Sequence, residues 1–170
     1  MADEPTFEDL LRSCQRSALH LEMRDLYSTS DPAYLAWQAD RHIDPLAFYG
    51  FWPKLLSEVV ARGVVVRRVR IVSEPISDYI RFEYDITEAL NLAAGEDVRW
   101  LSRRQASDLC LPGNDFWMFD ERVVMLNFFS GSGESAGHQV SDDTGLIKLY
   151  AQSFAAVWER AVPHEAYRLA

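Results

Sequence analysis

The sequence predicts an α/β domain in which helices flank a mixed β-sheet. Segments rich in β-branched or alternating apolar residues occur along the chain, and they alternate with segments whose apolar residues repeat at helical spacing. The chain has 170 residues, of which 48% are hydrophobic and 25% charged, as in a single globular domain. We therefore expect one domain over 1–170, with a mainly helical part at 1–63 and an α/β core at 64–170.

The N-terminal part is expected to contain one strand among several helices. Thr6 is a suitable N-cap for a first helix. Between 19 and 24, apolar and polar residues alternate, which predicts a half-buried strand, although continuation of the helix is an alternative. Asp31-Pro32 and Asp44-Pro45 are typical helix starts, and Gly63 is a typical helix end.

The α/β core is expected to follow the order strand, helix, strand, two paired strands and a final helix. The expected ranges are 64–72, 75–92, 98–101, 116–119 and 123–129, with the last helix capped by Ser141. The Gly- and Ser-rich segment 130–139 is expected to be a polar loop. Its glycines do not have the spacing of a phosphate-binding loop.

The charge and composition argue against several classes of function. The formal net charge of -9 argues against direct binding to nucleic acids or anionic membranes, since both require a basic surface. We find neither a signal peptide nor an apolar run long enough to span a bilayer, so we expect a cytoplasmic protein. Cys14 and Cys110 are expected to be reduced and mostly buried. The four histidines have no paired spacing, so no metal site or cofactor is predicted.

The order of elements over 64–162 resembles one half of the phospholipase D superfamily. Active members carry a His-x-Lys-x-x-x-x-Asp motif on a strand, and 116–120 is similar to its end. With Asp120 at the position of the motif Asp, Gly113 replaces the His and Asp115 replaces the Lys. The resemblance implies the fold but lacks the nucleophile and the phosphate-neutralising cation, so no catalytic residue is predicted. A diverged phosphodiesterase-like enzyme remains an alternative.

A second resemblance covers nearly the whole chain. LEMRDLY at 21–27, YIRFE at 79–83, GEDVR at 95–99 and DFWMFD at 115–120 resemble an actinobacterial domain-of-unknown-function family, number 6879. That family occurs beside genes for small helix-turn-helix regulators. The resemblance implies a non-catalytic regulatory or protein-interaction role, with such a regulator as the partner. The oligomeric state is left open, and a dimer is compatible with the sequence.

Charged residues near the ends of predicted strands are the candidate ligand contacts. Arginines at the carboxyl end of a strand favour a phosphate or carboxylate ligand, so a sensor of a small anion is the second functional hypothesis. The charges at 22–25 indicate either a polar binding site or a salt-bridged solvent face, and Arg81 is also expected to form helical ion pairs. The candidate ligand-binding residues are Glu22, Arg24, Asp25, Arg81, Arg99, Arg103, Arg104, Asp120 and Asn127.

Overall fold

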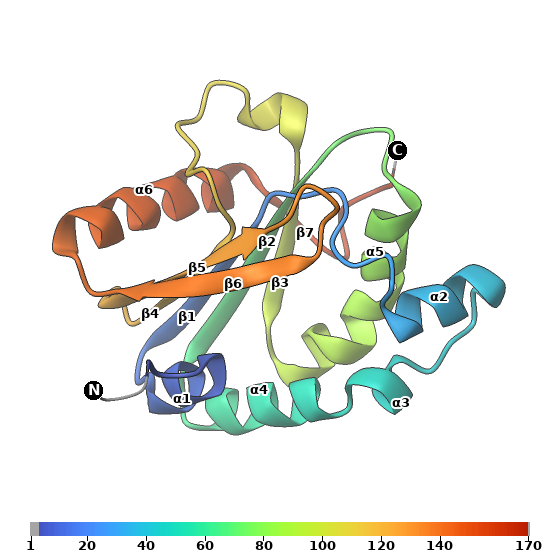
Figure 1. The fold of residues 1–170 in the computed structure, drawn as a ribbon, viewed down its shortest axis with the longest axis horizontal. Coiled ribbons are helices and arrows are strands. Elements are labelled where there is room, and N and C mark those ends of the chain that lie inside the picture. Colours follow the sequence, from blue (N-terminus) through green and yellow to red (C-terminus); the bar gives the residue numbers. More distant parts are fainter. Residues whose placement is uncertain (1–3, 170) are drawn as a thin grey trace.

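A seven-stranded mixed β-sheet forms the centre of the computed structural model, which describes residues 4–169 (Figure 1). The strand order is β6-β5-β4-β1-β2-β3-β7. The expected α/β class with a mixed sheet and flanking helices is confirmed. The strands are β1 (Ser17–Glu22), β2 (Val65–Val72), β3 (Asp97–Ser102), β4 (Phe116–Phe119), β5 (Val123–Phe129), β6 (Ser135–Ser141) and β7 (Val162–Pro163).

Three of the helices begin where the capping residues predict. Asp31 and Asp44 accept backbone hydrogen bonds at the starts of α2 and α3, and Thr6 forms a capping box with Asp9 at the start of α1. The helices are α1 (Phe7–Ser13), α2 (Pro32–Ala39), α3 (Pro45–Tyr49), α4 (Phe51–Ala61), α5 (Asp78–Leu90) and α6 (Thr144–Arg160), with short 3₁₀ turns η1 (Leu92–Ala94) and η2 (Arg103–Ala106). None of the helices within residues 4–169 has the length and apolar character needed to cross a lipid bilayer.

Parallel and antiparallel strands divide the sheet into two parts. β1, β2 and β3 are parallel, and the helical segments that connect them lie on one face of the sheet (Figure 1). β4, β5 and β6 form an antiparallel meander that pairs with the other edge of β1. Residues 4–63 therefore supply a central strand of the sheet as well as four helices.

The two faces of the sheet have different chemistry. Val69 and Ile71 on β2 pack with α6 in one apolar cluster. Because successive residues of a strand point to opposite faces, Arg68 and Arg70 point to the other face, which α1, α4 and α5 cover. Two guanidinium groups thus lie on a central strand in a layer that would otherwise be apolar.

Three details differ from the sequence-based expectations. The segment expected to be a loop at 130–139 contains β6, an edge strand whose exposed residues show no apolar alternation and which backbone pairing with β5 holds in place. Because β6 runs through Ser141, α6 begins later and is capped by Asp143. Cys14 is buried as expected, whereas Cys110 is exposed.

Candidate ligand-binding cavity

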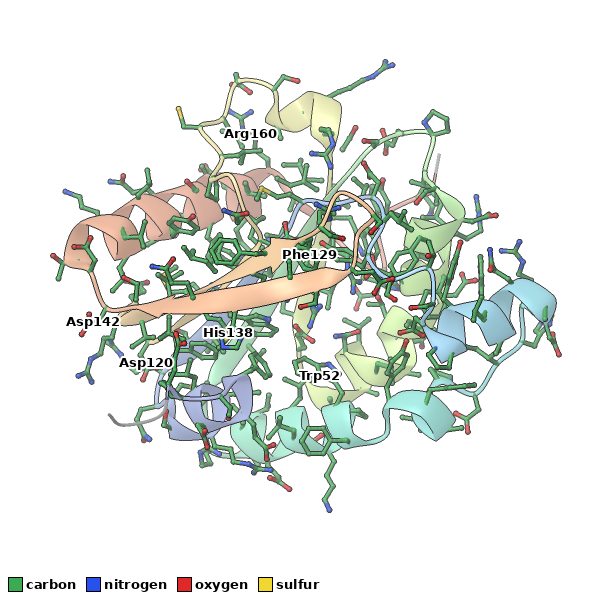
Figure 2. All side chains as sticks on the ribbon, viewed as in Figure 1. Trp52, Asp120, Phe129, His138, Asp142 and Arg160 are labelled. Carbon is green, nitrogen blue, oxygen red and sulfur yellow. The ribbon has the colours of Figure 1, made fainter. Side chains whose placement is uncertain are left out.

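A cavity of about 500 Å³ lies between the sheet and the helices that cover its arginine-bearing face. In Figure 2, Trp52 marks its α4 side and His138 marks its β6 side. Its lining residues come from most elements of the fold and are Phe7, His20, Asp31, Tyr49, Trp52, Arg68, Arg70, Tyr79, Phe82, Glu83, Ile86, Leu90, Asn91, Trp117, Met125, Asn127 and His138.

Polar and charged side chains from two neighbouring strands, β1 and β2, form the floor of the cavity. In the parallel register of β1 and β2, His20 lies beside Arg68 and Glu22 lies beside Arg70. All four residues are at most 8% exposed. Buried charges are costly unless they are paired, so this arrangement requires a complete set of partners.

Glu22 supplies the central pairing of this set. Its Oε1 accepts a hydrogen bond of 2.6 Å from Nη1 of Arg68, and its Oε2 accepts one of 2.6 Å from Nε of Arg70. Nε of Arg68 donates to Glu96 at 2.9 Å, and Nη1 of Arg70 donates to Thr87 at 2.8 Å. Each guanidinium is therefore held in a fixed orientation by two bonds to the protein.

Several polar atoms of the floor have no protein partner. Nη2 of Arg68 and Nη2 of Arg70 donate to no atom of the described residues, and neither is among the buried polar atoms that are sealed from solvent. Nδ1 of His20 and Oε2 of Glu83 are sealed and make no hydrogen bond within residues 4–169. Two free guanidinium donors thus face the cavity beside unpartnered buried atoms.

The floor shifts the pKa values of its titratable groups in opposite directions. Burial opposes ionisation of Glu22, but the Arg68 and Arg70 guanidiniums outweigh it and lower its pKa to about 2. Burial raises the pKa of Glu83 to about 7, despite the opposing effect of Arg70. Burial also lowers the pKa of His20 well below its ordinary value, so this imidazole is neutral. Such divergent pKa values in one cleft are typical of functional sites.

Aromatic side chains form the walls above this floor. The rings of Trp52 and Trp117 are 5.9 Å apart, and the Arg68 guanidinium lies over both, at 5.6 and 5.4 Å. Phe7 stacks on Trp52 with a centroid distance of 5.7 Å. Flat apolar walls above a cationic floor are suited to a ligand that combines a ring with an anionic group.

Comparison with known proteins places the chain in a family. The family model described as Domain of unknown function (DUF6879) matches residues 5–169. The chain belongs to this family. The expected membership of this domain family is thereby confirmed, and it supplies no activity. No curated protein matches the chain.

Two solved structures resemble this DUF6879 member in fold. One is Nuc, a phospholipase D family member from Salmonella typhimurium, with 14% identity and a TM-score of 0.51 over 95% of this chain and 88% of that chain. The other is TrmBL2, an archaeal chromatin protein whose structure is described as showing a novel mode of DNA binding. It has 12% identity and a TM-score of 0.50 over 91% of this chain and 48% of that chain. At these identities the likeness concerns the fold alone.

The structure brings one of the candidate ligand-binding residues to the lining of the main cavity and a second directly beneath it. Glu22 lies beneath the floor and orients both arginines, and Asn127 on β5 lines the cavity. The segment at 22–25 is therefore not a solvent face at Glu22. Arg24 and Arg103 line a separate hollow of about 360 Å³, and Asn127 borders it as well.

That second hollow coincides with the region of the phospholipase D-like motif. It is lined by Gly113 and Asp115, the positions that the sequence resemblance assigns to the His and Lys of the motif. Asp115 is buried and accepts hydrogen bonds from the main-chain N–H of Met23 at 2.9 Å and the hydroxyl of Tyr27 at 2.5 Å. Asp115 thus joins β4 to the segment after β1 and leaves no cation at the position of the motif lysine.

Arg103 and Asp25 form a structural brace at the carboxyl ends of β1 and β2. Nη2 of Arg103 donates to the carbonyl oxygens of Met23 and Ile71, and it lies 3.4 Å from Asp25. Asp25 also accepts a hydrogen bond from the main-chain N–H of Ser73 at 2.7 Å. These contacts occupy both charged groups with the protein itself.

The remaining candidate arginines lie away from the cavity. Arg99 points to the opposite face of the sheet, where its guanidinium lies 4.2 Å from the ring of Trp158. Arg104 is exposed on η2. Arg81 is exposed on α5, and no ion pair with Asp78 or Asp85 occurs within the described part of the chain.

Asp120 has a structural role in the turn between β4 and β5. Its carboxylate accepts hydrogen bonds from the main-chain N–H groups of Gln15, Arg16 and Ser17, which anchors the start of β1. These bonds overcome the effect of burial and lower its pKa. The one motif residue that the chain retains therefore supports the fold rather than the cavity.

The sequence contained one signal for the floor that we did not use. Arg68 and Arg70 interrupt the β-branched segment 64–72 at alternate positions, so both must face the same side of a strand. A strand that is expected to be central and carries two arginines on one face requires buried carboxylates nearby. Glu83 offered a second signal that we did not use, because it lies at helical spacing from Tyr79 and Ile86 and therefore on the buried stripe of α5.

Proposed function

We propose that this DUF6879 domain is a non-catalytic sensor that binds a small organic anion in the main cavity. The observation that carries the proposal is the pair of buried arginines, each of which leaves one Nη2 group free beneath aromatic walls. A guanidinium fixed by other bonds loses little side-chain entropy on binding, so its free donors are preorganised for a carboxylate.

The geometry favours binding over phosphodiester hydrolysis. Gly113 offers no nucleophile, and Asp115 at the position of the lysine repels a phosphate group. Arg68, Arg70 and their carboxylate partners belong to a tightly paired network rather than to a nucleophile and its base. Recognition of a ligand is therefore better supported than a diverged phosphodiesterase activity.

The proposal is tested by calorimetric titration with ring compounds that differ in charge. Indole-3-acetate supplies a ring and a carboxylate, indole-3-acetamide supplies the same ring without the charge, and acetate supplies the charge alone. We expect only indole-3-acetate to bind measurably and to raise the melting temperature. Equal binding of the acid and the amide contradicts a role for the arginines as an anion site.

A cavity-filling variant shows whether binding occurs at this location. Asn127 is half-buried, lines the cavity, and its side chain makes no hydrogen bond within residues 4–169, so Asn127→Phe places a ring in the cavity without breaking the floor. Gln139 on the neighbouring strand is exposed and points to the opposite face, which makes Gln139→Phe a matched control. The first substitution should abolish binding and the second should leave it unchanged.

A second candidate function, docking onto a helix-turn-helix regulator in the cytoplasm, is favoured by an exposed apolar patch. Leu46, Phe48 and Phe51, at α3 and the start of α4, are 49%, 45% and 59% exposed. Large exposed apolar side chains in one segment are typical of interaction surfaces. The net charge of -9 is complementary to a basic regulator.

This second candidate is tested by affinity purification from the native cell with identification of the bound proteins by mass. A stoichiometric helix-turn-helix protein is expected, and Phe51→Ser should release it. Leu149 on α6 is 50% exposed and lies outside the patch, so Leu149→Ser is the control and should retain the partner. Recovery of the domain alone contradicts the docking role.

A further inference from the structure

The charges of the cavity floor are balanced without any ligand. Two guanidiniums, Arg68 and Arg70, face two carboxylates, Glu22 and Glu96, through hydrogen bonds of 2.6 to 2.9 Å. These are the only guanidinium or ammonium groups among the described residues that line the cavity. An anion that binds to the free Nη2 groups therefore adds a negative charge beside arginines whose charges are already balanced.

Glu83 is the group whose charge decides whether this addition is tolerated. It comes from α5, is 8% exposed, and its Oε2 lies 3.7 Å from Nε of Arg70 without a hydrogen bond. An ionised Glu83 and a ligand carboxylate would share Arg70, and two like charges at one buried cation destabilise each other. A neutral Glu83 removes this repulsion and leaves the site free for an anion.

The surroundings of Glu83 favour its protonated form when an anion is present. The groups that act on it or line the same cavity are Glu22 and His20 on β1, Arg68 and Arg70 on β2, Asp115 before β4, Tyr27 after β1, Asp31 before α2, Tyr49 on α3, Tyr79 on α5 and His138 on β6. The two arginines already have carboxylate partners. A second anion beside Arg70 therefore acts on Glu83 mainly as a like charge.

Resting on the proposed function, we infer that the cavity takes a monoanionic aromatic acid together with one proton, which Glu83 accepts as the ligand binds beside Arg70. The inference includes a limit on ligand charge. A dianion such as a phosphate monoester brings a second charge for which the lining offers no further arginine or lysine. The site should therefore discriminate against phosphate monoesters in favour of aromatic monocarboxylates.

The test is calorimetric titration of the whole chain with benzoate, which is ionised throughout the range from about pH 6 to about pH 8.5. Binding enthalpies measured in two buffers of different ionisation enthalpy give the number of protons taken up. We expect uptake to approach one proton above pH 7, so that the Kd rises by up to about tenfold per pH unit. Phenyl phosphate should bind at least tenfold more weakly than benzoate at about pH 8.

Matched variants assign the proton to Glu83. Glu83→Gln should bind benzoate with no proton uptake and should bind it more tightly than the wild type at about pH 8. Glu88 is exposed on the same helix, so Glu88→Gln should keep the pH dependence of the wild type. Because His20 and His138 are unchanged in both variants, a pH dependence that persists in Glu83→Gln would overturn the inference.

The outcomes separate this inference from the proposed function. Benzoate binding without proton uptake overturns the inference and leaves the anion site intact. Benzoate that binds no better than neutral benzamide at every pH overturns both. Binding of benzylamine with proton release would identify a cation site at Glu83 and would also overturn both.

Discussion

Oε2 of Glu22 accepts a hydrogen bond of 2.6 Å from Nε of Arg70, the residue beside it on the next parallel strand. Its other oxygen accepts one of the same length from Arg68. A single carboxylate thus joins two buried guanidiniums, and its burial leaves no solvent to replace either bond. The stability of the sheet and the orientation of the proposed anion site therefore depend on the same residue.

Removal of the Glu22 charge should be strongly destabilising. Glu22→Gln leaves two buried cations short of a counter-charge, and the expected loss in the free energy of unfolding is about 3 to 5 kcal/mol. Urea denaturation monitored by circular dichroism measures it. Asp108→Asn is the control, because Asp108 pairs with Arg160 at an exposed position and should change stability little. Similar losses in both variants would show that the buried pairs of Glu22 contribute no more to stability than an exposed ion pair.

The stability of the protein should fall as pH rises through neutrality, and Glu83 should cause part of this fall. Its pKa is raised from 4.5 to about 7 in the folded state, so the folded state holds this proton more tightly than the unfolded chain does. The resulting stabilisation is complete below about pH 4.5 and is lost as pH rises to about 7 and above. Because buried His20 has a lowered pKa and acts in the opposite direction up to about pH 6.5, the decline in urea midpoints should be clearest from about pH 7 to about pH 8.5.

Variants separate Glu83 from other groups that act in the same direction. Burial also raises the pKa of Asp115 to about 6, so Asp115 adds to the decline at lower pH. Glu83→Gln should flatten the decline near pH 7 and make the protein more stable than the wild type at about pH 8. Glu88→Gln should keep the slope of the wild type. An unchanged slope in Glu83→Gln would refute the assignment.

The turn between β4 and β5 should be improved by a glycine. Asp120 and Glu121 have φ angles of 55° and 53°, in the left-handed region that is unfavourable for residues with a Cβ atom. Glu121 is exposed, so Glu121→Gly relieves this strain and should raise the free energy of unfolding by about 1 kcal/mol. Arg122 has no positive φ, so Arg122→Gly should instead lower stability. Thermal unfolding of both variants checks the opposite signs.

Most elements of the fold could be predicted because their signals are local. Asp31-Pro32 and Asp44-Pro45 mark helix starts through capping, and the β-branched run at 64–72 marks a strand. β6 could not be predicted in this way. It lies at an edge with both faces largely exposed, so only its backbone pairing with β5 makes it a strand.

The cavity was predictable only in part, for a physical reason. Glu22 was a candidate because polar residues that alternate with apolar ones on a strand indicate a polar face. The other charged residues around it come from β2, α5 and the turn before β3. Sequence spacing does not show that Arg68 meets Glu96 or that Arg70 meets Glu83. Arg99 lies within β3 rather than at its carboxyl end, and Arg104 lies in the turn that follows. The face to which each points depends on register and on that turn.

The hairpin between β5 and β6 should depend on one of its glycines and not on another. Gly133 has a φ of 92°, and a Cβ atom there would lie 2.3 Å from the carbonyl oxygen of Tyr27, so the backbone would have to move. Tyr27 also donates to Asp115, which links this turn to β4. Gly133→Ala should therefore lower the free energy of unfolding by about 1 to 3 kcal/mol.

Gly131 is the matched control in the same turn. It has no positive φ, and a Cβ atom there would meet nothing within 4 Å, so Gly131→Ala should leave stability unchanged or raise it slightly. Urea denaturation of the two variants measures the difference. A loss at Gly131 as large as that at Gly133 would mean that the turn requires flexible backbone throughout. A loss at Gly133 alone would identify the close approach to Tyr27 as the constraint that holds the hairpin against the segment after β1.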